Sequence, residues 1–462
     1  MQVTVGSQIR VDDPTPELVA WCKETLILPN PDYAKRARMH LWLGNTPQTI
    51  SLVEQDGNTL VLPYGCLKQA LSSSECEVVN ELPSDPLQVD YEATVPLYDY
   101  QEEAVEALLG EYYGILQSPP GSGKTQMGLA LAVALGRKTL WLTHTRDLLT
   151  QSKNRAEQYM DASLTGTITE GRVKIGKGIT FATVQTMCNL DLSRYKDVWD
   201  CVIVDECHRV AGTPTAVTQF SKVLNSLAAR HKYGLSATVH RADGMIAATY
   251  ALLGNVAHKV PDKAVADKVM TVTVTPRPTR VTMCRDFLDT DGTIIYAKLV
   301  NYLTEDFERN GLIINDLVLD EGHSCLILSD RLAHLEYLMG HLPREMRNRA
   351  VMVTGKMTSQ KAKAQRAQAM EDMRQGRKLY LFATYALAKE GLDIPRLDRL
   401  FLTTPQKDYA VVAQSIGRIA RTFPGKGDPV AYDYVDTGVQ YLARSFKKRC
   451  ATYRKCGCKF SE

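Results

Sequence analysis

One segment constrains the fold of this chain more than any other: Ser118-Pro119-Pro120-Gly121-Ser122-Gly123-Lys124-Thr125. It follows an apolar run at 113–117, typical of a buried strand, and precedes a helical pattern at 126–135. Small residues in such a loop let consecutive backbone N–H groups face a phosphate, and the positive end of the following helix adds to the attraction. The strict pattern has glycine where Ser118 stands. The strand–loop–helix context nevertheless predicts a phosphate-binding loop rather than a chance glycine-rich turn.

Short apolar runs alternate with helical patterns on both sides of this loop. We expect strands at 113–117, 139–143, 179–182, 201–204 and 232–235, and again at 324–328, 351–354, 379–383, 399–403 and 429–434. Such alternation predicts α/β domains, each a parallel sheet with helices on both faces.

The first 92 residues have a different pattern. They predict a small α+β unit with a strand at 2–11, a helix at 16–26 and a hairpin around Asp56-Gly57, and a linker with prolines follows. A chain of 462 residues also exceeds one ordinary core. We therefore divide it into 1–92, an accessory domain that is a candidate for DNA binding, 93–262, the first α/β domain, and 263–462, the second.

Composition limits the class of protein without naming a partner. Lys and Arg number 55 against 52 for Asp and Glu, a formal charge of +3, so a basic groove is neither required nor excluded. The N-terminus lacks the pattern of a secretory signal, and no apolar stretch is long enough to span a membrane. The eleven cysteines are mostly scattered singly, which favours reduced thiols and a cytoplasmic or nucleoid-associated protein.

The phosphate loop and a pair of carboxylates predict a nucleotide site for ATP and Mg²⁺. Lys124 would reach the β- and γ-phosphates, and the Thr125 hydroxyl would bind Mg²⁺. An apolar run at 201–204 ends in Asp205 and Glu206. Asp205 would hold the hydration shell of Mg²⁺ while Glu206 polarises the attacking water. A solvated acidic turn is the alternative, which the position after a phosphate loop disfavours.

Two later motifs narrow the class of nucleotide enzyme. Ser236-Ala237-Thr238 follows an apolar run, although alone it is no more than a polar loop after a strand. Gln414, Arg418 and Arg421 are spaced i, i+4 and i+7, so we expect them on one helix face. A solvated basic face is the alternative. An arginine is also what γ-phosphate transfer needs from a neighbouring domain, because its guanidinium neutralises charge in the transition state.

In this order, the motifs resemble those of superfamily 2 DExH-box helicases. The resemblance covers about residues 96–435, and it includes Gln101 upstream of the phosphate loop and Asp205-Glu206-Cys207-His208. After the Ser-Ala-Thr element, the segment Arg241-Ala242-Asp243-Gly244 resembles the sequence found in one branch of the superfamily. That branch contains the xeroderma-type repair helicases and the phage branch-remodelling helicases. Proteins of that branch often have a small N-terminal domain. The segment Leu62-Pro63-Tyr64-Gly65 resembles the end of such a domain.

The resemblance implies two tandem RecA-like domains and a role for each motif residue. The implied nucleotide-binding residues are Gln101 on the base, Gly121, Ser122, Gly123, Lys124, Thr125 and Asp205, with Thr125 and Asp205 on Mg²⁺; the implied catalytic residues are Glu206, Gln414, Arg418 and Arg421. The implied coupling residues are His208, Ser236, Ala237, Thr238, Gly391 and Asp393; the implied nucleic-acid contacts are Arg146, Thr183, Gln185 and Thr384.

The implied activity is ATP-dependent unwinding or remodelling of branched DNA, in repair or recombination, by closure of the two domains, and the implied partner is single-stranded or branched DNA. Three alternatives stay open: a duplex-DNA translocase that separates no strands, an RNA motor, and the motor subunit of a nuclease or repair complex. A nucleotide-switched binding module is disfavoured by the intact Glu206, Arg418 and Arg421. We expect a monomer with room for a protein partner and no membrane association.

Basic residues and cysteines elsewhere leave further alternatives open. The C-terminal tail carries Arg444, Lys447, Lys448, Arg449, Arg454, Lys455 and Lys459 among the aromatic residues Phe446, Tyr453 and Phe460. This pattern fits either nucleic-acid contact or a solvated terminus. The tail cysteines 450, 456 and 458 lack the paired spacing of a zinc site, so free thiols are favoured. Lys35, Arg36 and Arg38 form either a DNA-facing patch or a charged helix surface.

Overall fold

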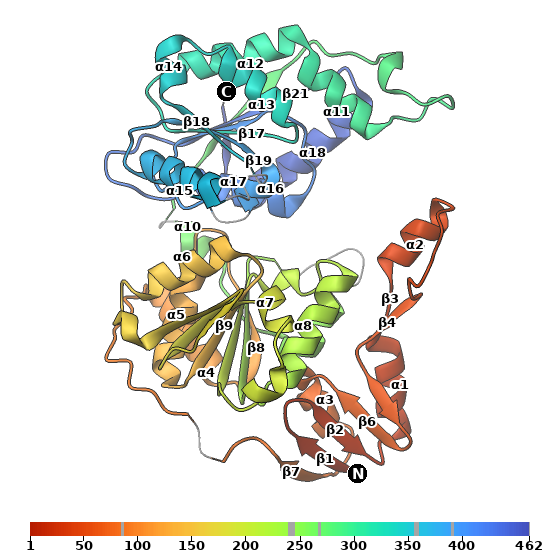
Figure 1. The fold of residues 1–462 in the computed structure, drawn as a ribbon. Helices are drawn as coiled ribbons and strands as arrows, with labels where there is room; N and C mark the ends of the chain where they lie inside the picture. The colour runs from red at the N-terminus through yellow and green to blue at the C-terminus, as the bar shows by residue number, and fades with distance from the viewer. Residues whose placement is uncertain (85–86, 239–244, 267–268, 355–359, 390–391, 462) are drawn as a thin grey trace. The chain divides into compact units, whose positions relative to one another are not determined.

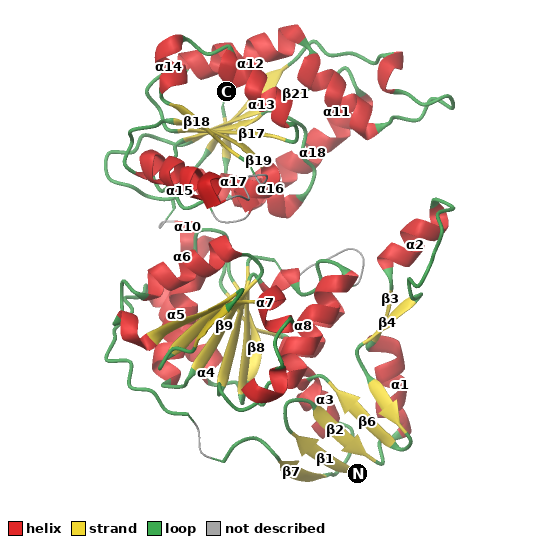
Figure 2. Ribbon diagram, viewed as in Figure 1, coloured by secondary structure: helices red, strands yellow, loops and turns green. Residues whose placement is uncertain are grey.

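The computed structural model describes residues 1–84, 87–238, 245–266, 269–354, 360–389 and 392–461. The chain divides into two compact units, one of residues 1–119 and 123–261 and the other of residues 120–122 and 262–462 (Figures 1 and 2). None of the described helices is long and apolar enough to cross a membrane.

The N-terminal part of the first unit is a five-stranded sheet of order β5-β6-β2-β1-β7. Its elements are β1 (Gln2–Val5), β2 (Ile9–Asp12), α1 (Pro16–Thr25), β3 (Ile27–Pro29), α2 (Pro31–Arg38), β4 (Thr49–Ser51), β5 (Glu54–Asp56), β6 (Thr59–Leu62), the 3₁₀ turn η1 (Tyr64–Cys66), α3 (Leu67–Ser72) and β7 (Glu77–Asn80).

Two expectations for this part need correction. The strand predicted at 2–11 is a hairpin of β1 and β2, because the chain turns at Gly6, whose N–H donates to the Gln8 carbonyl at 3.0 Å. The hairpin around Gly57, which has φ +57°, is present, but β5 rather than residues 48–53 pairs with β6. Residues 49–51 pair with β3 instead.

The rest of the first unit is built on an eight-stranded sheet of order β11-β10-β12-β9-β13-β14-β8-β15. All neighbouring strands in it are parallel except β10 and β11. The elements are α4 (Asp99–Leu109), β8 (Tyr113–Gln117), α5 (Lys124–Leu135), β9 (Thr139–Thr143), α6 (Arg146–Ala156), β10 (Thr165–Thr169), β11 (Arg172–Lys174), β12 (Ile179–Thr183), α7 (Val184–Cys188), β13 (Cys201–Asp205), η4 (Cys207–Arg209), α8 (Pro214–Ser226), β14 (His231–Ser236), α9 (Ile246–Leu253) and β15 (Val256–Lys259).

Helices cover both faces of this sheet, with α4, α5 and α6 on one side and α7 and α8 on the other (Figure 1). The strands are apolar at nearly every position because both faces are buried. On β9, Leu140 and Leu142 belong to the core that also contains Phe220 of α8. Trp141, between them, faces α5, where Gly128 leaves room for its ring: a Cβ on Gly128 would lie 2.7 Å from Trp141.

The N-terminal sheet is joined to the eight-stranded part of the first unit by a tight interface around η1. A Cβ on Gly65 would lie 2.4 Å from the Gly254 backbone nitrogen and 2.6 Å from the Ala251 carbonyl oxygen, so the two backbones touch. The Tyr64 hydroxyl donates to the Arg230 carbonyl at 3.0 Å. One continuous core runs from Val3 and Leu18 to Ala248 and Ala251.

Lys232, at the start of β14, is buried in the same interface. Its Nζ donates to the carbonyls of Ser7 and Leu224 at 2.9 and 2.8 Å, and it lies 4.6 Å from the centre of the Tyr64 ring. Burial lowers the pKa of Lys232 to about 7.

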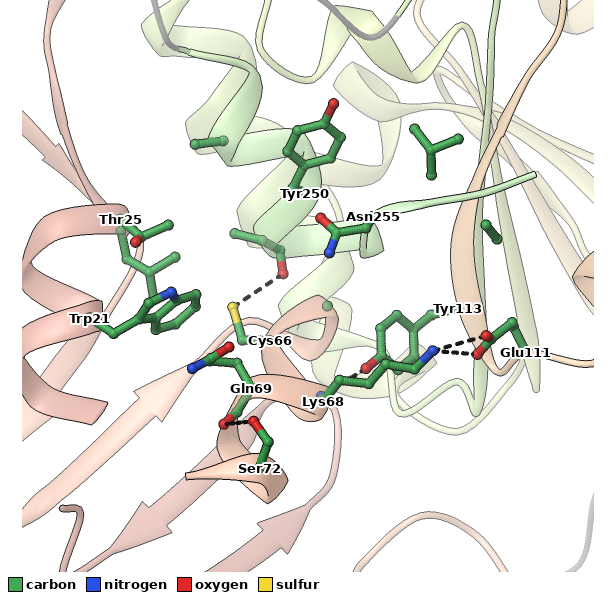
Figure 3. Close-up of a pocket in the computed structure, with 16 residues that line it drawn as sticks. Trp21, Thr25, Cys66, Lys68, Gln69, Ser72, Glu111, Tyr113, Tyr250 and Asn255 are labelled. Atoms are coloured by element: carbon green, nitrogen blue, oxygen red, sulfur yellow. Dashed lines mark hydrogen bonds and ion pairs between the residues drawn. The ribbon is translucent and has the colours of Figure 1, made fainter. Parts of the chain in front are cut away.

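Beside this interface lies a pocket of about 610 Å³. Trp21, Cys66 and Gln69 line it from the N-terminal side, and Tyr250 and Asn255 from the other (Figure 3).

The second unit is built on a seven-stranded parallel sheet of order β18-β19-β17-β20-β21-β16-β22. Its elements are α10 (Asp262–Ala266), β16 (Thr273–Pro278), α11 (Tyr296–Glu305), α12 (Phe307–Leu319), β17 (Cys325–Ser329), α13 (Leu332–Gly340), α14 (Arg344–Asn348), β18 (Ala350–Val353), α15 (Gln360–Arg374), β19 (Tyr380–Thr384), α16 (Tyr385–Lys389), β20 (Arg399–Leu402), α17 (Tyr409–Ile419), β21 (Val430–Val435), α18 (Gln440–Lys455) and β22 (Lys459–Phe460). The expected fold class, two parallel-sheet α/β domains after a small α+β part, is confirmed.

Candidate nucleotide site

The phosphate loop joins the end of β8 to the start of α5, as the motif predicts. Gly121 and Gly123 have φ of +84° and +81°, a conformation that L side chains rarely adopt. Lys124 and Thr125 are the first two residues of α5, where backbone N–H groups have no partner within the helix. The start of α5 therefore has the donors and the positive potential that bind a phosphate.

Gln101 is buried in α4 and lies against this loop. The backbone N–H of Tyr98 donates to its Oε1 at 3.0 Å, which helps to cap α4. A Cβ on Gly123 would come within 2.5 Å of its Nε2, so a larger residue there would displace the Gln101 side chain. The structure thus brings Gln101 to the phosphate loop, while its contact with a base stays a prediction.

Asp205 ends β13, which lies between β9 and β14 in the sheet, and its side chain is buried. The backbone N–H of Glu206 donates to its Oδ1 at 3.0 Å, and the Ser152 hydroxyl donates to its Oδ2 at 3.4 Å. Burial and the Glu206 carboxylate raise the pKa of Asp205, while the nearby Lys124 ammonium lowers it.

Cations therefore stabilise the ionised form of Asp205. The Asp205 carboxylate and the Thr125 hydroxyl at the start of α5 are both hard oxygen ligands, which is the kind of ligand that Mg²⁺ prefers. Sequence reasoning missed Ser152, whose only signal is its place on the buried face of α6 between Leu149 and Ala156.

His208 connects the carboxylate pair to the Ser236–Thr238 loop. Its Nδ1 lies 3.3 Å from Glu206 Oε2 and 3.0 Å from Ser236 Oγ. The Ser236 hydroxyl also lies 2.8 Å from the Thr238 carbonyl, and when it donates to that carbonyl, Nδ1 of His208 is the donor to Ser236. The Ser118 N–H donates to the Ser236 carbonyl at 2.9 Å, which ties this loop to the phosphate loop.

The residues assigned to nucleic acid in the first unit follow the ends of its strands. Arg146 begins α6 and pairs with Glu170 at 3.2 Å. Thr183 is buried, and its hydroxyl accepts from the Thr186 N–H at 3.3 Å to cap α7. Gln185 Nε2 lies 3.2 Å from Nδ1 of His144, a residue that sequence reasoning missed. Burial and the neighbouring Arg209 lower the pKa of His144.

Of the predicted arginines of the second unit, Arg418 lies in the last turn of α17 and Arg421 follows the helix. Arg418 donates to the Leu392 carbonyl at 2.8 Å and to the Ala388 carbonyl at 3.2 Å. Helix α17 ends at Ile419, so the expectation that Arg421 shares a helix face with Gln414 and Arg418 is wrong.

Arg421 is held instead by an ion pair with Asp393. Lys426, which sequence reasoning missed, fixes the chain after α17 by donating to the Ile419 and Arg421 carbonyls, both at 2.6 Å.

Of the remaining assigned residues, the structure places Thr384 but does not describe Gly391 or residues 241–244. Thr384 ends β19, where it pairs with Ser329 of β17. Gly391 and the segment Arg241-Ala242-Asp243-Gly244 lie outside the described residues.

The basic C-terminal tail divides into a buried and an exposed part. Arg449 is 3% exposed and binds Asp433 through two hydrogen bonds of 2.8 Å, and Tyr453 donates to the same carboxylate at 2.7 Å. These two residues therefore belong to the core, and nucleic-acid contact is wrong for them.

The tail cysteines are free thiols, and no group of three or more His, Cys, Asp or Glu in the described part of the chain is arranged to hold a metal ion. Burial raises the pKa of Cys456 to about 11.

Two family models match parts of the chain. Residues 94–241 match the family "Type III restriction enzyme, res subunit", and residues 310–423 match "Helicase conserved C-terminal domain". "Probable helicase D10" of Escherichia phage T5 is 26% identical over 381 residues, which are 82% of this chain and 78% of that protein. "DNA 3'-5' translocase XPB2" of Sulfurisphaera tokodaii is 30% identical over 215 residues, 46% of each chain.

Among solved structures, Dbp5 of S. cerevisiae, bound to RNA and ADP BeF3, has the same fold with a TM-score of 0.56. It is 18% identical, and the match covers 79% of this chain and 90% of that one.

Proposed function

This chain belongs to superfamily 2 of the helicases, nearest to the XPB-like and phage helicases, and hydrolyses ATP; from that premise we propose that it unwinds or remodels branched DNA. The observation that carries the proposal is that Nδ1 of His208 contacts both Glu206 and Ser236. Glu206 follows β13 and Ser236 ends the neighbouring strand β14, so the three residues lie at the carboxyl ends of these strands. A binding module without turnover would need neither the carboxylate nor this link.

The residues of the first unit have distinct parts in the proposed ATP hydrolysis. Lys124 and the N–H groups at the start of α5 bind the phosphates. Thr125 and Asp205 would hold Mg²⁺, which when bound neutralises charge on the β- and γ-phosphates. Glu206 orients the attacking water and accepts its proton.

The coupling of hydrolysis to movement is assigned to His208 and Ser236. Because Nδ1 of His208 contacts both Glu206 and Ser236, a change at the γ-phosphate that moves Glu206 changes the hydrogen bonds of the Ser236–Thr238 loop. We assign Arg418 and Arg421 to the neutralisation of transition-state charge when the two domains close on ATP. Arg421 would then exchange its Asp393 partner for phosphate oxygen.

DNA is the proposed track because the similar XPB2 protein is named as a DNA 3'-5' translocase. The fold alone does not separate DNA from RNA, since motors of this kind mostly contact the sugar–phosphate backbone. Dependence on 2′-hydroxyls would favour RNA.

The test is the steady-state ATPase rate without nucleic acid and with single-stranded DNA, duplex DNA, forked DNA or single-stranded RNA, with Glu206→Gln as the control. We expect forked or single-stranded DNA to stimulate most, and the control to abolish the stimulation. Stimulation by duplex DNA without strand separation would replace the proposal with a duplex translocase. No stimulation by any polymer would contradict it.

A role as the motor subunit of a nuclease complex is a second candidate, favoured by the match of residues 94–241 to a restriction-enzyme subunit family. Affinity purification from the native host would recover a nuclease in stoichiometric amount if this candidate is correct.

A further inference from the structure

One segment of the N-terminal part is packed against the core only at its base, where Leu28 and Ile50 lie, and its helix has no buried residue. Residues 27–51, hereafter the arm, comprise β3, α2, β4 and the loop before β4, and they project from the N-terminal sheet (Figure 1). Helix α2 has no buried residue, although surface helices normally bury one face. A helix of eight residues without packing is marginal alone, so its position indicates another role than core formation.

The arm is nevertheless built as an ordered element. Asn30, 3% exposed, caps α2 by accepting from the Asp32 N–H at 3.0 Å, and its Nδ2 donates to the Pro47 carbonyl at 2.8 Å. At the tip, Arg36 donates to the Trp42 carbonyl at 2.9 Å. Its shape is therefore fixed before any partner binds.

The tip presents a large aromatic ring to solvent. Trp42 is 85% exposed, whereas Trp141 and Trp199 are at most 1% exposed. Its ring lies over Gly44, which has φ +52°, and a Cβ at that position would be 2.9 Å from the ring. The neighbouring Met39 and Leu41 are 55% and 51% exposed. An exposed apolar cluster on an ordered arm indicates a binding surface.

The basic residues near the Trp42 ring indicate a negatively charged partner. The arm carries Lys35, Arg36 and Arg38 against one acidic residue, Asp32, whereas the rest of residues 1–92 has twelve acidic residues against three basic ones. A polyanion is therefore attracted to the arm and repelled by the remainder of the N-terminal part. Basic side chains beside an exposed aromatic ring are what phosphates and unpaired bases require together.

We propose that the arm is a nucleic-acid contact in which Trp42 stacks on an unpaired or terminal base of branched DNA while Lys35, Arg36 and Arg38 contact its phosphates. This inference rests on the proposed function and adds a substrate contact outside the two motor domains. The proposal explains three observations: α2 has no buried residue, Trp42 is exposed, and the arm is basic while the rest of residues 1–92 is acidic.

The first test is binding of the full-length protein to fluorescein-labelled forked DNA, measured by anisotropy. Base stacking of this kind predicts that Trp42→Ala weakens binding about 5- to 150-fold, while Trp42→Phe keeps most of the affinity. Forked DNA should also quench the tryptophan emission that is present in the wild type and missing in Trp42→Phe. Equal affinity of Trp42→Ala and the wild type would overturn the proposal, as would quenching by anionic phospholipid vesicles but not by DNA.

The second test separates phosphate contacts from general charge. Lys35→Ala combined with Arg38→Ala should reduce the slope of log affinity against log salt by about 1.4–1.8, since each phosphate contact contributes about 0.7–0.9. Arg344→Ala with Arg349→Ala is the matched control, because both residues are exposed and precede β18, whereas the motif residue Thr384 lies at the far end of the neighbouring strand β19. A slope that changes equally in both pairs would contradict the proposal.

Failure of this inference differs from failure of the proposed function. If the function is wrong, no nucleic acid stimulates the wild-type ATPase. If only the inference is wrong, forked DNA stimulates the wild type and Trp42→Ala to the same extent at the same concentration.

Discussion

Replacing Gly65 with alanine tests whether the N-terminal part is fixed to the first motor domain. The new Cβ would lie 2.4 Å from Gly254 N and 2.6 Å from the carbonyl oxygens of Ala251 and Tyr250. All three are backbone atoms, so no side-chain rotation relieves the overlap. Helix α9 and η1 would have to separate by roughly 1 Å to reach ordinary contact.

The cost follows from this geometry. Overpacking of a well-packed site costs about 1–3 kcal/mol, and loss of the hydrogen bond from Tyr64 to the Arg230 carbonyl adds about 1 kcal/mol. We therefore expect the free energy of unfolding of the first unit to fall by about 3 kcal/mol. For a unit of this size that lowers the melting temperature by about 6–12 °C.

The assay is thermal unfolding of the full-length protein at one scan rate, followed by limited proteolysis near residues 80–92. Gly311→Ala is the control, because Gly311 is an exposed position of α12 and no atom outside the helix backbone lies within 4 Å of its Cβ position. That substitution should stabilise by about 0.5–1 kcal/mol. An unchanged melting temperature and proteolysis pattern for Gly65→Ala would refute the tight interface.

Three further predictions concern the site and its pH dependence. Glu206→Gln should bind ATP but hydrolyse little of it, measured by nucleotide binding and phosphate release; wild-type turnover would remove its role as base. Arg421→Ala should keep ATP binding and lower hydrolysis by about 10³-fold or more, and wild-type turnover there would sink the assignment. Burial lowers the pKa of Lys232 from 10.5 to about 7, so the unfolded chain binds more protons between those values and stability rises with pH across that window. Lys232→Met should lose this rise, which between pH 7 and 9 is at most about 2–3 kcal/mol, in denaturant titrations at those two pH values, and an unchanged pH slope would show that Lys232 does not contribute it.

The nucleotide site shows how far local sequence can go. A strand, a loop of small residues and a helix are consecutive in the chain, so their geometry depends on near neighbours, and the loop between β8 and α5 is where the motif predicts it. The carboxyl ends of parallel strands share one edge, which is why Asp205 and Ser236 could be expected near the loop.

The same reasoning fails where a contact joins distant parts of the chain. The basic tail has one composition, yet Arg449 is buried against Asp433 while Lys447 and Lys448 are exposed. Helical spacing alone placed Arg421 on a shared face, but α17 ends two residues earlier and Asp393 holds the side chain.

The sequence by itself determined the chemistry, namely the phosphate loop, the carboxylate pair and the two runs of alternating strands and helices, because each is encoded within a few consecutive residues. Only the tertiary structure decided what each buried face packs against. Lys232 and Ser7 are 225 positions apart and meet because the N-terminal sheet joins the first motor domain, and Trp42 is exposed because no other element of its unit covers the arm. Periodicity records that a face is buried, whereas the identity of its partner depends on the free energy of the whole fold.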